Sequence, residues 1–152
     1  MVGGTDQLHC TALGKAHLAW MPFEDVRRIM REVGMPKVTP HTIVTISDLK
    51  ADLERTRTRG YALDREESML GAFCVAVPIL NEDHKPVAAM SVAGPQVRFN
   101  ERQLDAVSSA LIQAAGAIQA KLGTPSHISP ICAPPPERIP RAAGSRPARA
   151  AR

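Results

Sequence analysis

The nine residues from 72 to 80, AFCVAVPIL, constrain the fold more than any other stretch, because they hold no charge and are apolar on both alternating faces. A strand with this pattern is covered on both sides of its sheet. A turn-forming cluster, NEDHKP, follows at 81–86, and a second β-prone run, VAAMSVA, occupies 87–93. Two such runs around a turn cluster predict an antiparallel hairpin.

The register of this hairpin predicts one face of small side chains. Pairing position 80 with position 87 sets Cys74 opposite Ala93 and Ala76 opposite Ser91. Because side chains alternate along a strand, these four residues share a face. Their small size leaves room for another molecule or element above the sheet.

Four helices are predicted around the hairpin from caps and apolar periodicity. Thr11 and Ser47 are the expected N-caps of the first and third helices, Gly34 and Gly60 end the second and third, and a capping box opens the last. The predicted helices cover 12–21, 22–33, 47–59 and 101–122, and a short β-prone run covers 41–45. The inner face of the last helix is expected to hold Leu104, Val107, Leu111, Ala114, Ala115, Ile118 and Leu122. These elements predict an α+β fold, with helices packed against an antiparallel sheet.

The net charge of +4 belongs to the end of the chain. Residues 1–123 contain 14 Lys or Arg and 14 Asp or Glu, whereas residues 124–152 contain five Arg and one Glu, with seven of the 13 prolines. A basic, proline-rich segment with few apolar residues cannot bury enough surface to order itself. We therefore predict one folded domain over 1–123 and a disordered Pro/Arg/Ala-rich tail over 124–152.

Composition also excludes several classes of protein. The N-terminus MVGGTDQLHC lacks the basic start and apolar core of a signal peptide, and no apolar run is long enough to cross a bilayer, so a cytoplasmic protein without membrane contact is expected. Cys10, Cys74 and Cys132 are scattered and form no CxxC pair, which indicates reduced thiols. We expect neither a metal site nor a cofactor.

Three stretches together carry a family resemblance: LHCTALGKAHLAW at 8–20, GYALDREESMLGAFCVAVPI at 60–79 and VAAMSVAGP at 87–95. In this order and spacing they resemble the C-terminal effector-binding domain of the IclR family of bacterial transcriptional regulators. The resemblance implies a GAF-like (profilin-like) domain that senses a small metabolite and adjusts operator binding by dimers or tetramers. It also implies an N-terminal winged helix-turn-helix and opening strands upstream, so this chain is expected to be a truncated member without direct DNA contact.

The resemblance also implies a site for a small organic acid effector. Its backbone donors fall on Ala12 and Leu13, and its polar side chains are Asp64, Cys74 and Ser91. A second serine of the family pattern is an alanine here, at position 93. The residues alone point the same way, because the first turn of a helix attracts carboxylates and a few polar groups in an apolar shell are typical of a ligand site.

Each side chain of this site has a structural interpretation as well. Asp64 can cap the turn that follows it, Cys74 can be a small core residue, and Ser91 can bond a neighbouring strand. Glu66 and Glu67 are expected to be structural partners of arginines or backbone groups.

Two other functions compete with effector binding as interpretations of this sequence. An enzyme with a Cys74 nucleophile needs a nearby base, and no histidine is close to Cys74 in the sequence, so no enzymatic activity is expected. A ligand-free dimerisation or interaction module, or a non-functional fragment, stays open, because missing strands would leave an unpaired sheet edge.

Overall fold

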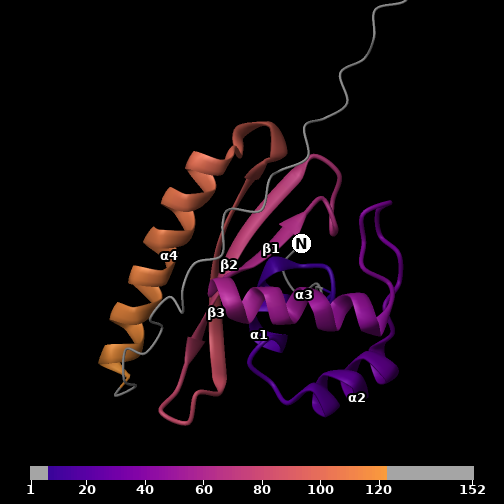
Figure 1. The fold of residues 1–152 in the computed structure, drawn as a ribbon, viewed down its shortest axis with the longest axis horizontal. Helices are drawn as coiled ribbons and strands as arrows, with labels where there is room; N and C mark the ends of the chain where they lie inside the picture. Colours follow the sequence, from indigo (N-terminus) through magenta and orange to yellow (C-terminus); the bar gives the residue numbers. More distant parts are fainter. Residues whose placement is uncertain (1–6, 123–152) are drawn as a thin grey trace, which may run out of the picture.

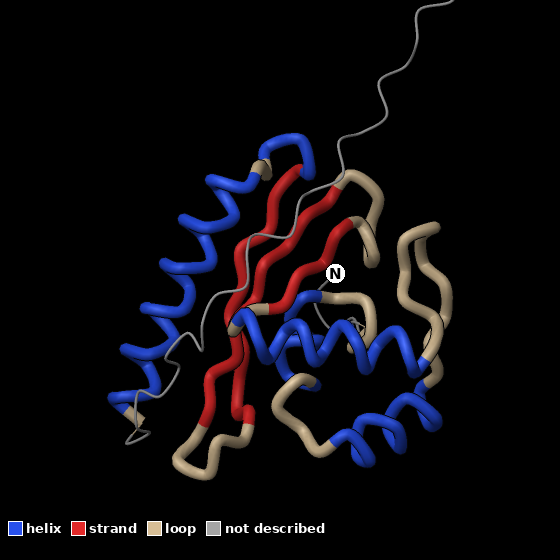
Figure 2. The backbone as a smooth tube through the Cα atoms, in the orientation of Figure 1, coloured by secondary structure: helices blue, strands red, loops and turns tan. Residues whose placement is uncertain are grey.

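The computed structural model describes residues 7–122, which place helices on both faces of a three-stranded antiparallel sheet of order β1-β2-β3 (Figure 1). The elements are α1 (Ala12–Leu18), α2 (Phe23–Val33), α3 (Ile46–Arg59), β1 (Ala62–Arg65), β2 (Ala72–Leu80), β3 (Pro86–Pro95), η1 (Gln96–Arg98) and α4 (Glu101–Lys121). Helix α4 covers one face, and α1 to α3 lie on the other side (Figures 1 and 2). The α+β prediction is confirmed, and no helix in this part of the chain is long and apolar enough to cross a membrane. The predicted tail at 124–152 lies outside the described residues.

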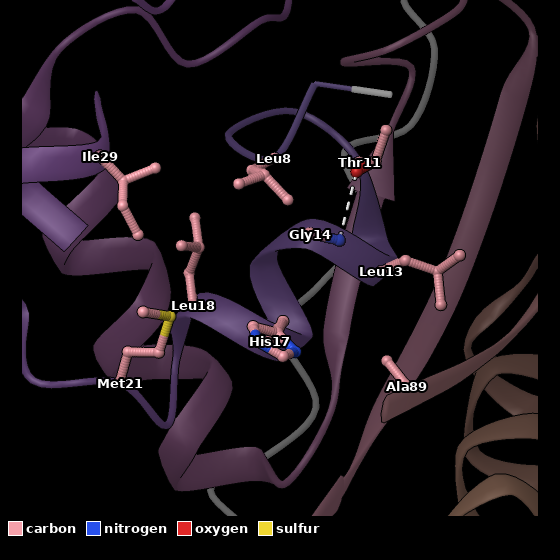
Figure 3. Close-up of a pocket in the computed structure, with 9 residues that line it drawn as sticks. All are labelled: Leu8, Thr11, Leu13, Gly14, His17, Leu18, Met21, Ile29 and Ala89. Carbon is pink, nitrogen blue, oxygen red and sulfur yellow. Dashed lines mark hydrogen bonds between the residues drawn. The ribbon is translucent and has the colours of Figure 1, made fainter. Parts of the chain in front are cut away.

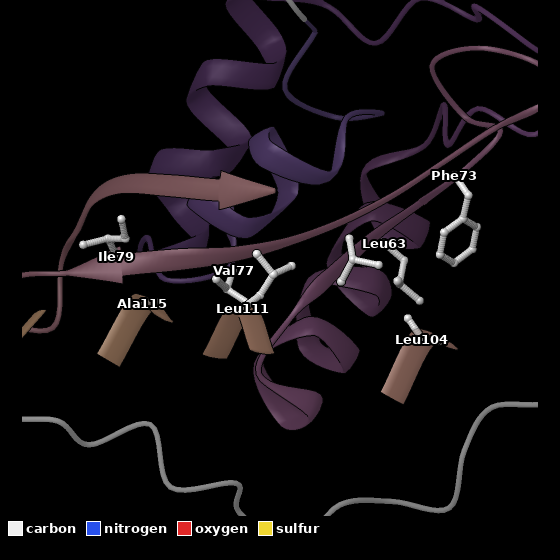
Figure 4. Packing of buried hydrophobic residues seen from close by; sticks show 8 residues of the cluster. Leu63, Phe73, Val77, Ile79, Leu104, Leu111 and Ala115 are labelled. Atoms are coloured by element: carbon white, nitrogen blue, oxygen red, sulfur yellow. The ribbon is translucent and has the colours of Figure 1, made fainter. Parts of the chain in front are cut away.

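Strand β2 is the middle strand, which explains why its sequence is apolar on both faces. Every second side chain of β2, beginning with Phe73, packs with one residue of β1 and with the inner face of α4 (Figure 4). The buried residues of this layer are Leu63, Phe73, Val75, Val77, Ile79, Leu104, Leu111 and Ala115. Burying one large aliphatic or aromatic side chain contributes about 1.5–3 kcal/mol, so this layer supplies much of the stability of the domain.

The β2–β3 register is the predicted one over most of its length. Cys74 is opposite Ala93, and Ala76 is opposite Ser91. Only beside the turn does the pairing shift, where a bulge sets residue 80 opposite Pro86. A proline has no N–H to donate to the ladder, which is why prolines occur at strand ends and bulges.

Helix α1 approaches the other face of the sheet closely because its contact residues are small. Ala12 and Ala16 pack directly on Ala76 of β2 and its neighbours. Gly14 allows the preceding backbone to cross over the helix, since a Cβ at this position would lie 2.3 Å from the carbonyl oxygen of Leu8. The start of α1 is thereby held over the small-residue face of the hairpin.

The strand β1 was missed by the sequence analysis. It is only four residues long, ALDR, and two of those residues are charged, so it lacks the apolar run that marked β2. Its pairing with β2, with Asp64 opposite Cys74, supplies the third strand of the sheet.

The strand predicted at 41–45 is absent, and this stretch is a loop that leads into α3. The Thr42 hydroxyl donates to the carbonyl of Glu67 at 2.7 Å. The loop is thus hydrogen-bonded to the turn after β1 and not to a neighbouring strand. Thr45, rather than the predicted Ser47, caps α3 by accepting from a backbone N–H of its first turn. β-branched residues alone could not distinguish this loop, of which only Thr42 is buried, from a strand.

Helix α1 ends at Leu18, three residues before its predicted end. Met21 precedes Pro22, and a residue in that position is disfavoured from helical backbone geometry. The guanidinium of Arg57 on α3 donates to the carbonyls of Ala19 and Met21, at 2.9 Å for Met21. These bonds satisfy acceptors that the early end of the helix exposes.

Helix α4 begins with the predicted capping box, but its last turn is rotated from expectation. Ile118 and Leu122, predicted to face inward, are 37% and 59% exposed, whereas Gln119 is buried. The side-chain oxygen of Gln119 accepts from the backbone N–H of Leu80 at 3.3 Å. The backbone N–H of Leu80 at the end of β2 needs an acceptor, so a polar side chain occupies this inward-facing position of α4.

Candidate functional site

Three of the five predicted site residues lie on the sheet face that α1 covers. Asp64 is opposite Cys74, and Ser91 is opposite Ala76 in the next row. The Cys74 thiol donates to the backbone carbonyl of Val75 at 3.9 Å, and the Ser91 side chain lowers the pKa of this thiol slightly against the larger effect of burial. Ala93, where the resemblance expects a second serine, is directly opposite Cys74. The result is a short polar row in a face that is otherwise lined by alanines.

The other two predicted residues form the start of α1. Thr11 caps this helix, and its hydroxyl oxygen accepts from the N–H of Gly14 at 3.2 Å. Ala12 is buried against the sheet, whereas Leu13 is 39% exposed. Within residues 7–122, the backbone N–H groups of Ala12 and Leu13 donate no hydrogen bond. Two donors are therefore available at the end of α1 that carries its positive dipole.

A cavity of about 490 Å³ opens beside this helix (Figure 3). Its walls are α1 with the loops on either side of it, the side chain of Ile29 on α2, and Ala89 on β3. Ala89 shares the sheet face of Ser91, two positions along the same strand, so the cavity continues the small-residue face outward. The lining residues are Leu8, Thr11, Leu13, Gly14, His17, Leu18, Met21, Ile29 and Ala89, of which only Leu13 belongs to the predicted set. His17, on the exposed side of α1, was not predicted as a site residue.

Asp64 is already engaged in this structure. Its side chain is almost completely buried, and its carboxylate accepts from the backbone N–H of Glu67 at 2.8 Å and of Ser68 at 3.2 Å. The Ser68 hydroxyl donates to the second carboxylate oxygen. In this state Asp64 caps the turn after β1, as its structural interpretation predicts. The expectation that Glu66 serves a backbone group is also confirmed, since it accepts from the N–H of Gly71 at 2.6 Å.

A buried ion network, which the sequence analysis missed, lies behind this turn. The ammonium of Lys15 is completely buried, 2.5 Å from Oε1 of Glu67 and 3.0 Å from Oδ2 of Asp52. The partner of Glu67 is thus a lysine rather than an arginine. Lys15 lies on the same face of α1 as Ala12 and Ala16, and a lysine on a helix face of buried alanines is the signal that could have revealed the network.

The two carboxyl groups of this network differ in acidity. Burial raises the pKa of Glu67 to about 7, although the Lys15 ammonium opposes the shift. Burial also acts to raise the pKa of Asp52, but the positive charges of Lys15, Arg59 and Arg55 outweigh it and hold that pKa below its ordinary value. One buried ammonium is therefore shared by two carboxylates, and Glu67 is the less compensated of the two.

The two cysteines among the described residues are weak nucleophiles. Burial raises the pKa of the Cys74 thiol, and burial together with the charge of Asp64 raises the pKa of Cys10 to about 11. Both are free thiols that stay protonated at neutral pH. In this part of the chain, no three His, Cys, Asp or Glu side chains are arranged to hold a metal ion.

Comparison with known proteins agrees with the fold and with the resemblance. The family model described as "Bacterial transcriptional regulator IclR C-terminal" matches residues 1–120. The HTH-type transcriptional regulator BhcR of Paracoccus denitrificans is 39% identical over 113 residues, which are 74% of this chain and 40% of that protein. The chain thus spans about 40% of the length of this curated relative, and the relatives are transcriptional regulators rather than enzymes.

Solved structures agree as well. The C-terminal domain of the transcriptional regulator KdgR from E. coli superposes with a TM-score of 0.73 at 34% identity, covering 76% of this chain and 71% of that one. A double mutant of the inducer-binding domain of the transcription factor PobR from Acinetobacter, in complex with 3-hydroxybenzoic acid, superposes with a TM-score of 0.68 at 27% identity, covering 74% and 65%.

Proposed function

The chain belongs to the IclR family of bacterial transcriptional regulators, as a C-terminal domain of the kind that generally binds effectors, and from that premise we propose that it senses a small organic acid. The proposed binding surface extends from the cavity beside the start of α1, which Leu13 and Ala89 line, toward the polar row of the sheet. Binding there adjusts operator binding by the DNA-binding domain that the longer family members carry.

The observation that supports this proposal is that two kinds of polar group lie on the two sides of the contact between α1 and the sheet. The N–H groups of Ala12 and Leu13 donate no intramolecular hydrogen bond among residues 7–122, and they lie at the end of α1 that attracts a carboxylate. The polar row of Cys74 and Ser91 lies under the same helix. The complex of PobR with a hydroxylated aromatic acid supports this ligand class.

Asp64 supplies the link from ligand to conformation. An effector hydroxyl that donates to this carboxylate approaches the oxygen that accepts from the Ser68 hydroxyl. The effector therefore competes with the turn after β1 for the same acceptor. A ligand that binds one arrangement of this turn better than the other shifts the population of the two, and that shift changes the assembly of the regulator.

The test is isothermal titration calorimetry of the purified chain with a panel of small keto, hydroxy and aromatic carboxylates. Ser91→Ala and Asp64→Asn are expected to weaken binding of the best ligand at least about tenfold, the loss expected for one hydrogen bond to a charged group. Ser109→Ala, an exposed serine on α4, is the matched control and is expected to bind normally. Equal affinity in Ser91→Ala, Asp64→Asn and the wild type would contradict the site.

Self-association as a dimer or tetramer is the second part of the proposal. Strand β3 is an edge of the sheet in the described residues, and it exposes Val87 (54%) and Val92 (41%). Exposed strand edges with apolar residues favour pairing with another chain. This observation also favours the alternative of a ligand-free dimerisation module. Light scattering after size exclusion distinguishes the two, because effector-dependent mass supports sensing and a constant dimer mass supports the module.

A further inference from the structure

A second cavity, of about 260 Å³, lies between α3, β1 and the loop before α3. It shares no lining residue with the cavity beside α1. Its charged or titratable lining residues are His41, Asp52, Arg55, Arg59, Arg65 and Glu67. Neither the family match nor the predicted effector residues account for this group.

The carboxylates of this cavity are more deeply buried than the guanidinium of Arg55. The carboxylates of Asp52 and Glu67 are at its inner end, where their side chains are only 11% and 10% exposed. Arg55 is at the rim with a side chain that is 53% exposed, and the His41 residue is exposed as well. The two carboxylates are therefore deeper than Arg55, the Lys15 ammonium that contacts both of them is completely buried, and Arg59 and Arg65 are half-buried.

Glu67 is short of hydrogen-bond donors. Its Oε1 contacts the Lys15 ammonium, which Asp52 shares, while Arg55 contacts only Asp52, at 3.2 Å. Within residues 7–122, Oε2 of Glu67 is buried and accepts no hydrogen bond. A buried carboxylate oxygen without a hydrogen-bond donor destabilises the fold. Rotation about the terminal side-chain torsion of Glu67 can turn either of its two oxygens toward the cavity.

We propose that this cavity binds an α-amino acid as its zwitterion, with the ammonium group against the Glu67 carboxylate and the carboxylate toward Arg55 at the rim. A simple carboxylate can pair with Arg55 at the rim, but its charge then lies near the acidic side chains of Asp52 and Glu67. A simple amine can pair with Glu67 but leaves Arg55 without a negative partner from the ligand. A ligand with both charges pairs with the buried Glu67 and with Arg55 at the rim.

The same geometry predicts that binding of the amino acid depends on the protonation state of Glu67. The charged groups that face Glu67 are Lys15 of α1, Asp52 of α3, Asp64 of β1 and the rim residues. Because the pKa of Glu67 is about 7, much of it is protonated near neutral pH, and an ammonium ligand requires the ionised form. Binding therefore releases a proton, and affinity is expected to be about tenfold weaker at pH 6 than at pH 8.

The experiment is calorimetric titration of the purified chain with the twenty amino acids, and with the α-hydroxy acid and the amine that match the best of them. Each titration is repeated at pH 6 and pH 8, in buffers of different ionisation enthalpy, to count protons. Backbone amide shifts in NMR spectra are expected to change along α3 and β1 and not at the start of α1. This separates the second cavity from the effector site, so either proposal can fail without the other.

Two pairs of variants complete the test. Glu67→Gln is expected to weaken binding at least tenfold and to abolish proton release, whereas Glu66→Gln, in the same turn but outside the cavity, is expected to bind normally. Arg55→Gln is expected to weaken binding, and Arg31→Gln on the exposed side of α2 is its control. His41→Gln removes the imidazole that lines the same cavity and shows whether the proton release belongs to Glu67 alone. The proposal is overturned if no amino acid binds, if the hydroxy acid or the amine binds equally well, or if neither Glu67→Gln nor Arg55→Gln changes the affinity.

Discussion

Replacing Lys15 by methionine removes the only ammonium of the buried network while keeping a side chain of similar length. The two carboxylates of Asp52 and Glu67 then face each other without it, in a site where their side chains are about nine-tenths buried. Breaking a buried ion pair by removing one partner costs about 3–5 kcal/mol, because an uncompensated charge stays buried. We expect Lys15→Met to lower the free energy of unfolding by this amount at neutral pH.

The matched control is Lys50→Met on the exposed side of α3. Lys50 is 3.9 Å from Glu54, and both side chains are more than half exposed. Exposed pairs of this kind contribute about 0–1 kcal/mol, so the two substitutions are expected to differ severalfold in cost.

Urea unfolding followed by circular dichroism measures both variants. The slope with urea is expected to stay the same, so that the midpoint reports stability. The triple variant Lys15→Met, Asp52→Asn, Glu67→Gln is expected to recover most of the loss, since it removes the buried charges altogether. A loss below about 1 kcal/mol in Lys15→Met would refute the view that this network is energetically coupled.

Three further predictions follow from single features. Because the pKa of Glu67 is raised, the stability that this residue contributes is fully present below pH 4.5 and is lost as pH rises through about 7. The difference in unfolding free energy between wild type and Glu67→Gln is therefore expected to change across this pH window and to stay constant above it. Gly14→Ala would place a Cβ 2.3 Å from the Leu8 carbonyl oxygen and is expected to lower the free energy of unfolding by about 1–3 kcal/mol in the same urea assay. Its control, Gly116→Ala on α4, adds a Cβ in open space and is expected to raise the free energy of unfolding by up to about 1 kcal/mol. Cys74 is expected to react with iodoacetamide much more slowly in the folded chain than in urea, and comparable rates would show that the thiol is activated.

The hairpin register could be predicted because its information is local. A turn cluster lies between two β-prone runs, and the small residues of β2 and β3 match across it. The one error, the bulge at Pro86, arises from a missing N–H that a pairing by position ignores. The capping box of α4 was equally local and equally correct.

What could not be predicted depends on contacts between distant segments. Strand β1 is recognisable only through its pairing with β2, and the loop at 41–45 only through the bond from Thr42 to the carbonyl of Glu67. The Lys15 network joins residues from α1, α3 and the turn after β1, and nothing in any one of these stretches identifies its partners. The candidate site was predicted as a set of residues on one sheet face, but the present engagement of Asp64 required the turn geometry.

The position of β2 in the middle of the sheet, with apolar side chains on both faces, also sets the order in which the domain opens. Its amide hydrogens are expected to exchange with solvent only when the whole domain unfolds, whereas the sheet-facing side of the seven-residue α1 rests on alanines that bury little surface each. The candidate effector site therefore spans a strand that is packed on both faces and a helix that contacts this strand through small side chains. Movement in response to a ligand will be concentrated in the helix, while the strand serves as its fixed reference.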